Sequence, residues 1–127
     1  MDTLIENKNL FIEGTKVFPE VDFNASGDLK ITGRIISDHM CEHFLPAFQW
    51  IEECTCEMIY LEVNLDYLNS NGMFLLLELL RCMENRKEIK DISVMWYYEE
   101  EDEEHFELGE IIRQKLNRTR FNYLSYV

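Results

Sequence analysis

Basic residues are scarce in this chain of 127 residues. Lys and Arg together number 12 against 25 Asp and Glu, which gives a formal net charge of −13. Nucleic acids are bound through basic side chains that displace counterions from phosphates, and anionic membrane surfaces attract the same side chains. The composition therefore argues against both kinds of partner, and the negative charge favours partners with basic surfaces.

Long hydrophobic runs are also missing. The longest apolar stretch, from Met73 to Leu80, is interrupted by Glu78 and is far shorter than the ~20 residues that span a bilayer. The N-terminus does not combine a basic segment with an apolar one, so it does not resemble a secretory signal. We therefore expect a cytoplasmic protein with no membrane insertion.

Proline and glycine are few, with two and five residues, whereas 46% of the residues are hydrophobic. This composition is typical of a globular chain and not of a disordered one. The length suits one domain. We expect a single domain over residues 1–127, in which residues 1–8 form a flexible N-terminal segment.

The cysteines and histidines do not form a recognisable metal or redox motif. Cys54 and Cys56 are separated by one residue, whereas zinc and redox motifs usually place two residues between their cysteines. His39 and His43 have a spacing that suits a metal on one helix face, but no third ligand is evident nearby and the pattern H-E-x-x-H is missing. We therefore expect reduced thiols and no cofactor.

Hydrophobic periodicity divides the chain into strands and helices. Two alternating segments, 16–23 and 29–33, flank a turn-forming cluster and predict a β-hairpin. The elements expected after it are a helix around 44–51, a strand 58–65, a helix 73–85, a strand 89–98, a helix 103–116 and a strand 121–126. The order ββαβαβαβ predicts an α/β fold with a mixed, mostly parallel sheet and helices covering its faces.

The start of the first helix is set by polar residues and by a proline. Ser37 or Asp38 suits the N-cap position. Pro46 lies inside the helical pattern, so it should either bend this helix or mark its true beginning.

The turn at residues 66–72 is the strongest candidate site. In open α/β sheets, binding sites collect beyond the carboxyl ends of the strands. Asn69 or Ser70 would cap the next helix, and Gly72 would let a partner's backbone approach closely. A phosphate on Ser70 would lie at the positive end of the helix dipole and add about −1.5 to −2 charges. A serine that only caps the helix is the alternative interpretation.

Ordered motifs along the chain match those of a known family. They are Ile12-Glu13-Gly14-Thr15 with Pro19-Glu20-Val21, Gly33-Arg34 with Glu42, Pro46 and Trp50, Tyr67-Leu68-Asn69-Ser70, and Trp96-Tyr97-Tyr98-Glu99-Glu100 with Asp102-Glu103 and Gly109-Glu110. In order and spacing they resemble the SiaC-type regulatory phosphoproteins of bacteria, which act in biofilm and cyclic-di-GMP signalling. The resemblance covers most of the chain.

This resemblance implies a STAS-like domain, similar to the anti-sigma-factor antagonists, that works as a phosphorylation switch and not as an enzyme. In the family, a dedicated serine/threonine kinase phosphorylates the hydroxyl residue after the Asn of the turn, and a PP2C-type phosphatase removes the phosphate. The unphosphorylated form binds and stimulates a diguanylate cyclase. By position, the acceptor here would be Ser70. The residues expected to contact partners are Tyr67, Leu68, Asn69, Asn71, Gly72, Asp38, His39 and Glu42.

Two segments depart from the family pattern. The family continues the turn with hydroxyl residues and a Lys, whereas this chain has Asn71, Gly72, Met73 and Phe74. Residues 37–40 likewise differ from the usual P-E-N-S. The alternative hypothesis is therefore a constitutive scaffold or interaction subunit of the same fold that has lost the switch.

The acidic run at residues 99–104 has three interpretations: a divalent-cation site, a solvated segment and a patch that faces a partner. Cation-binding loops space their ligands as in D-x-D-x-D-G, and that spacing is not present. A solvated run whose carboxylates lie near a positive helix N-terminus is the favoured interpretation.

Overall fold

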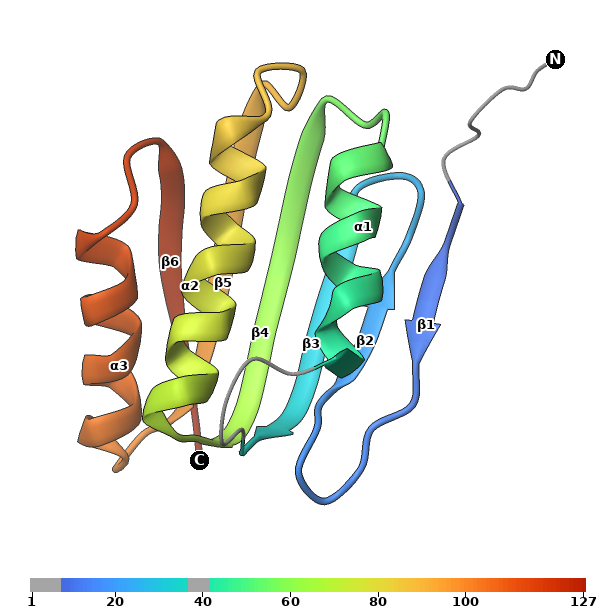
Figure 1. The fold of residues 1–127 in the computed structure, drawn as a ribbon. Helices are drawn as coiled ribbons and strands as arrows, with labels where there is room; N and C mark the ends of the chain where they lie inside the picture. The colour runs from blue at the N-terminus through green and yellow to red at the C-terminus, as the bar shows by residue number, and fades with distance from the viewer. Residues whose placement is uncertain (1–7, 37–41) are drawn as a thin grey trace, which may run out of the picture.

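A computed structural model describes residues 8–36 and 42–127 of the chain (Figure 1). Within these residues, one six-stranded sheet has the order β1-β2-β3-β4-β5-β6. The elements are β1 Leu10–Ile12, β2 Glu20–Phe23, β3 Asp28–Ile35, the 3-10 turn η1 Glu42–Phe44, α1 Leu45–Glu53, β4 Met58–Leu68, α2 Ser70–Asn85, β5 Asp91–Glu99, α3 Glu103–Gln114 and β6 Thr119–Tyr126.

The sheet is mixed, as the sequence predicted. The pairs β1–β2 and β2–β3 are antiparallel, and the pairs β3–β4, β4–β5 and β5–β6 are parallel. The parallel strands lie in the sheet in the same order as in the chain. Right-handed crossovers between them therefore place every connecting helix on the same side of the sheet. Figure 1 shows α1, α2 and α3 on one face of the sheet. The expectation that helices cover both faces is therefore met on one face only.

The hydrophobic core lies between the helices and this covered face. On β4, Ile59, Leu61 and Val63 are buried, whereas Tyr60 between them is exposed on the open face. This alternation is typical of a sheet with one solvated face. On the helix side, α2 contributes the fully buried side chains of Leu76, Leu79, Leu80 and Met83.

A β-bulge interrupts the pairing of β3 with β4. Gly33 pairs with Leu65 and Arg34 pairs with Tyr67, so Asp66 is an extra residue in β4. Bulges of this kind often occur beside functional sites, where they change the direction of side chains. Here the bulge separates the buried Leu65 from the buried Leu68 by two exposed residues.

The N-terminal half differs from the sequence prediction in three places. The strand β2 begins at Glu20 and not at Lys16. The strand β1 was not predicted, and it pairs with β2 along its three residues. The expected cap of the first helix is wrong, because α1 begins at Leu45 with Phe44 at its N-cap and no side-chain cap. Pro46 stands in the first turn, so it marks the helix start and does not bend the helix. Residues 1–7 and 37–41, with Ser37 and Asp38, lie outside the described residues.

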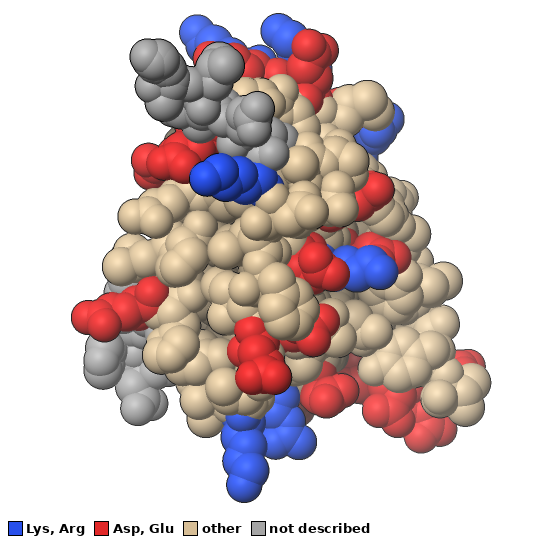
Figure 2. Space-filling model, turned by 90° about the vertical axis from the view of Figure 1, so that its right-hand side faces the viewer, with Lys and Arg blue, Asp and Glu red and all other residues tan. Residues whose placement is uncertain are grey.

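Charged side chains are scattered over the edge formed by β1. Figure 2 views the molecule from this edge and shows small red and blue groups separated by wide uncharged areas.

None of the helices within residues 8–36 and 42–127 is both long and apolar enough to cross a membrane.

Candidate functional site

Asn69 holds the start of α2. Its backbone is extended, and its Oδ1 accepts a hydrogen bond of 2.8 Å from the Gly72 N–H. Its own N–H donates to the carbonyl oxygen of Ile35 on β3 at 3.1 Å. The N-cap role therefore belongs to Asn69. Ser70, the first residue of the helix, is exposed and is not needed as a cap.

Gly72 is buried against the end of β3. A Cβ at this position would lie 2.6 Å from Ile35 Cγ2 and 3.0 Å from the Ile35 carbonyl oxygen. The missing side chain therefore makes room for Ile35. This corrects the expectation that Gly72 leaves space for the backbone of a partner.

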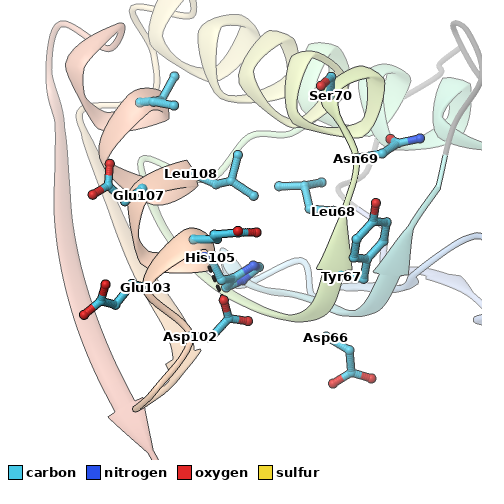
Figure 3. Close-up of a pocket in the computed structure, with 12 residues that line it drawn as sticks. Asp66, Tyr67, Leu68, Asn69, Ser70, Asp102, Glu103, His105, Glu107 and Leu108 are labelled. Atoms are coloured by element: carbon cyan, nitrogen blue, oxygen red, sulfur yellow. Dashed lines mark hydrogen bonds between the residues drawn. The ribbon is translucent and has the colours of Figure 1, made fainter.

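An open hollow of about 620 Å³ lies between the β4–α2 turn and the N-terminus of α3 (Figure 3). We call it the acidic hollow, and its lining residues are Asp66, Tyr67, Leu68, Asn69, Ser70, Asp102, Glu103, Glu104, His105, Glu107, Leu108 and Ile111. Five of these are carboxylates and none is Lys or Arg. Leu68, Leu108 and Ile111 supply apolar wall. Ser70 is thus part of a negatively charged depression.

His105 is the buried polar side chain of the acidic hollow, with 4% of its surface exposed. Its ring stacks on Trp96 at a centroid distance of 5.0 Å. Its backbone N–H donates to Oδ1 of Asp102, the N-cap of α3, at 3.0 Å. Within the described residues, its Nε2 has no hydrogen-bond partner. Figure 3 shows the imidazole extending from α3 toward β4.

Burial lowers the pKa of His105, although the carboxylates of Asp102 and Asp66 act in the opposite direction. The ring is therefore neutral at neutral pH. A neutral imidazole can offer one ring nitrogen as a hydrogen-bond acceptor.

The structure brings together four of the predicted site residues. Tyr67, Leu68, Asn69 and Ser70 line the acidic hollow, whereas Gly72 is buried beneath the helix.

The other predicted partner contacts lie elsewhere or are not described. Asn71 is exposed beside Ser70, and Glu42 is exposed in η1, outside the lining of the hollow. Asp38 and His39 lie outside the described residues.

Sequence reasoning missed the contribution of α3. The sequence predicts the acidic run at the start of the third helix, but the pattern does not connect it with the turn at Ser70. A signal was available: β4 and β5 are neighbouring parallel strands, so their carboxyl ends share one edge of the sheet and the helices that follow begin side by side. The described residues contain no group of three or more His, Cys, Asp or Glu that could hold a metal ion.

Comparison with known proteins gives one family and one fold. The model of the SiaC family of regulatory phosphoproteins matches residues 12–126. No curated protein matches the chain. The structure of SiaC of Pseudomonas aeruginosa is similar, with a TM-score of 0.80 and 22% identity over 93% of this chain and 98% of that chain.

A second similar structure is that of the diguanylate cyclase SiaD in complex with its activator SiaC, also from Pseudomonas aeruginosa. The TM-score is 0.80, with 23% identity over 92% of this chain and 99% of the matched chain. Similarity at this level of identity concerns the fold. The family assignment depends instead on the sequence match, which extends from β1 to the end of β6. The chain belongs to the SiaC family of regulatory phosphoproteins.

Proposed function

We propose that this chain is a non-enzymatic switch whose binding to a protein partner is controlled by phosphorylation of Ser70. The observation that carries the proposal is the division of roles in the β4–α2 turn. Asn69 caps the helix, which leaves the neighbouring Ser70 exposed with no structural task as a cap. An exposed hydroxyl in the first turn of a rigid helix is accessible to a kinase.

The surface around Ser70 suits docking of a protein. Tyr67 and Phe74 are 53% and 55% exposed. Ser70 and Phe74 are four residues apart in α2 and so lie on the same face of the helix. Large exposed aromatic side chains beside a modifiable residue support a partner surface that includes the serine.

Phosphorylation would oppose docking at this surface. The phosphate adds about −1.5 to −2 charges, and an interface would have to bury them. No Lys or Arg lines the acidic hollow, so this chain offers the phosphate no basic partner there. A buried and unpaired dianion is strongly unfavourable. The unphosphorylated form is therefore the binding form.

The partner in this proposal is a diguanylate cyclase. The similar protein of Pseudomonas aeruginosa is described as the activator of the diguanylate cyclase SiaD and forms a complex with it. A serine/threonine kinase and a PP2C-type phosphatase would set the phosphorylation state of Ser70.

The test begins with phosphorylation of the purified full chain by its cognate kinase and ATP, followed by mapping of the phosphate by mass spectrometry. We expect the phosphate on Ser70. In binding measurements with the cognate cyclase, Ser70→Ala should bind as the wild type does, and Ser70→Asp should bind at least about tenfold more weakly, a loss of about 1.4 kcal/mol.

Ser125→Asp is the matched control, because Ser125 is an exposed serine on β6. A phosphate found elsewhere, or unchanged binding of Ser70→Asp, would contradict the proposal. A Ser70 that stays unmodified in the native cell under all growth conditions would favour the constitutive scaffold.

A further inference from the structure

The acidic hollow needs an explanation beyond the stability of α3. Glu103 and Glu104 stand in the first turn of α3, where carboxylates are favourable because they face the positive end of the helix dipole. That argument does not account for Asp66, which comes from the bulge of β4 on the other side of the hollow. Acidic residues from two elements therefore line one depression.

His105 is the independent observation that points to a ligand. A buried polar atom normally has a hydrogen-bond partner, and one without a partner calls for an explanation. Nε2 of His105 has no partner within the described residues, and the side chain lines the acidic hollow. A group that enters the hollow and donates a hydrogen bond would satisfy this atom after a small adjustment of the ring.

The walls suit a side chain with an apolar stem and a cationic head. Leu68, Leu108 and Ile111 can pack against methylene groups. The stems of Lys and Arg side chains generally lie along apolar surface of this kind. The exposed ring of Tyr67 can contact a cation through its face. A guanidinium group has five donors and no acceptor, so it is matched to carboxylates and to an accepting imidazole nitrogen.

We propose that the acidic hollow receives an arginine side chain of the protein partner, with its guanidinium among the carboxylates and beside His105 Nε2. This inference rests on the proposed function, since the partner is the one whose docking Ser70 controls. A metal ion is the less suitable occupant, because the described residues hold no group of three ligands arranged for one. The net charge of −13 favours a basic partner surface in the same way.

The position of Ser70 connects the hollow with the switch. Ser70 lines the hollow, so a phosphate on it would stand at the entrance. The phosphate group would fill space at the mouth of the hollow that the arginine side chain has to cross. Insertion of the arginine and phosphorylation would therefore be alternatives at one site.

The first test uses a defined probe and needs neither kinase nor phosphate. The full chain, labelled with ¹⁵N, is titrated with N-acetyl-arginine amide, and the neutral isostere N-acetyl-citrulline amide serves as the control ligand. We expect saturable NMR shifts for Asp66, Glu107 and the ring of His105 with arginine, and at least tenfold weaker binding of citrulline.

Equal effects of the two ligands, or the lack of localised shifts, would overturn the proposal. Magnesium chloride that produces the shifts when arginine does not would also overturn it, in favour of a metal site.

The second test uses two matched variants of the acidic run. Glu103→Gln/Glu104→Gln removes two charges that line the hollow, and Glu100→Gln/Glu101→Gln removes two charges from the same run that do not line it. Each carboxylate is an exposed partner of the cation, so we expect the first variant to weaken binding of the arginine probe and of the cyclase by roughly two- to tenfold. The second variant should bind as the wild type does.

Equal weakening by both variants would indicate a general effect of charge and would contradict the assignment. The two proposals fail separately. If the chain binds arginine but Ser70 is never phosphorylated, the arginine site stands and the phosphorylation switch is wrong. If Ser70 is phosphorylated but the chain does not bind arginine, the switch stands and the arginine site is wrong.

Discussion

Gly72 in the first turn of α2 lies directly against Ile35 at the end of β3, where an added Cβ would approach Ile35 Cγ2 to 2.6 Å. The β-branched side chain of Ile35 has little freedom to move away, and its carbonyl oxygen would be 3.0 Å from the same atom. The contact fixes the turn that carries Ser70 to the sheet.

Substitution Gly72→Ala should therefore destabilise the protein. Overpacking costs about 1–3 kcal/mol and alanine returns up to about 1 kcal/mol through its helix propensity, so we expect a net loss of about 1–2 kcal/mol. Urea unfolding followed by circular dichroism measures this loss. In the double variant with Ile35→Ala, the loss should be smaller than the sum of the single losses. A Gly72→Ala protein as stable as the wild type would contradict the close packing.

Asn69 is expected to contribute to stability as an N-cap. Asn69→Ala removes the acceptor of the Gly72 N–H and should cost about 1 kcal/mol in the free energy of unfolding. Asn69→Asp keeps an acceptor oxygen and should lose much less. The control is Asn122→Ala, which removes an exposed asparagine from β6. Equal unfolding midpoints for Asn69→Ala and Asn69→Asp would argue against the capping role.

His105 should make stability depend on pH in the weakly acidic range. Burial holds its pKa in the folded state below the usual value of about 6.5, so the unfolded state binds the proton more tightly. The stabilisation is complete above pH 6.5 and is lost as the pH falls through the folded pKa. The Cε1–H resonance of His105 in an NMR titration should give a midpoint below 6.5.

The variant His105→Gln provides the complementary measurement, because it should flatten the dependence of unfolding free energy on pH in this range. A His105 midpoint at or above 6.5 would show that the carboxylates of Asp66 and Asp102 outweigh burial.

Arg118 closes the C-terminal end of α2. Its side chain donates hydrogen bonds of 2.8–3.2 Å to the carbonyl oxygens of Met83, Glu84, Arg86 and Ile89. Carbonyl groups at the end of a helix lack partners within the helix. We expect Arg118→Ala to cost about 2–3 kcal/mol in thermal or urea unfolding.

Arg120→Ala is the control for this substitution. Arg120 is exposed and pairs with Asp91, so its loss should change stability by no more than about 0.5 kcal/mol. Equal effects of the two substitutions would show that the carbonyl contacts of Arg118 contribute little.

Most of the fold was predictable from the sequence because its elements are long and strongly patterned. Two parts were not. The strand β1 has only three residues and pairs with β2 alone, so it leaves no measurable alternation. The strand β4 was predicted to end at Leu65 because the bulge at Asp66 breaks the alternation there, although pairing continues to Leu68.

The candidate site was predictable only in part. The turn around Ser70 follows from its place after a strand and from the capping preference of asparagine. This turn lies beside Asp102 and His105 because β4 and β5 are neighbours in the sheet. The order of strands in the sheet cannot be inferred from the local sequence of either segment. The packing of Gly72 on Ile35 likewise joins residues far apart in the chain.

The extra residue Asp66 in β4 and the position of Ser70 are two separate features of the protein, although they lie close together in the sequence. Gly33 would still pair with Leu65, and Arg34 with Tyr67, in a chain that lacked Asp66. Deletion of this one residue would close the ladder and leave the helix start in its place. The presence of the bulge residue and the position of Ser70 at the start of α2 are thus independent. Among descendants of one ancestor, either could be lost while the other is inherited.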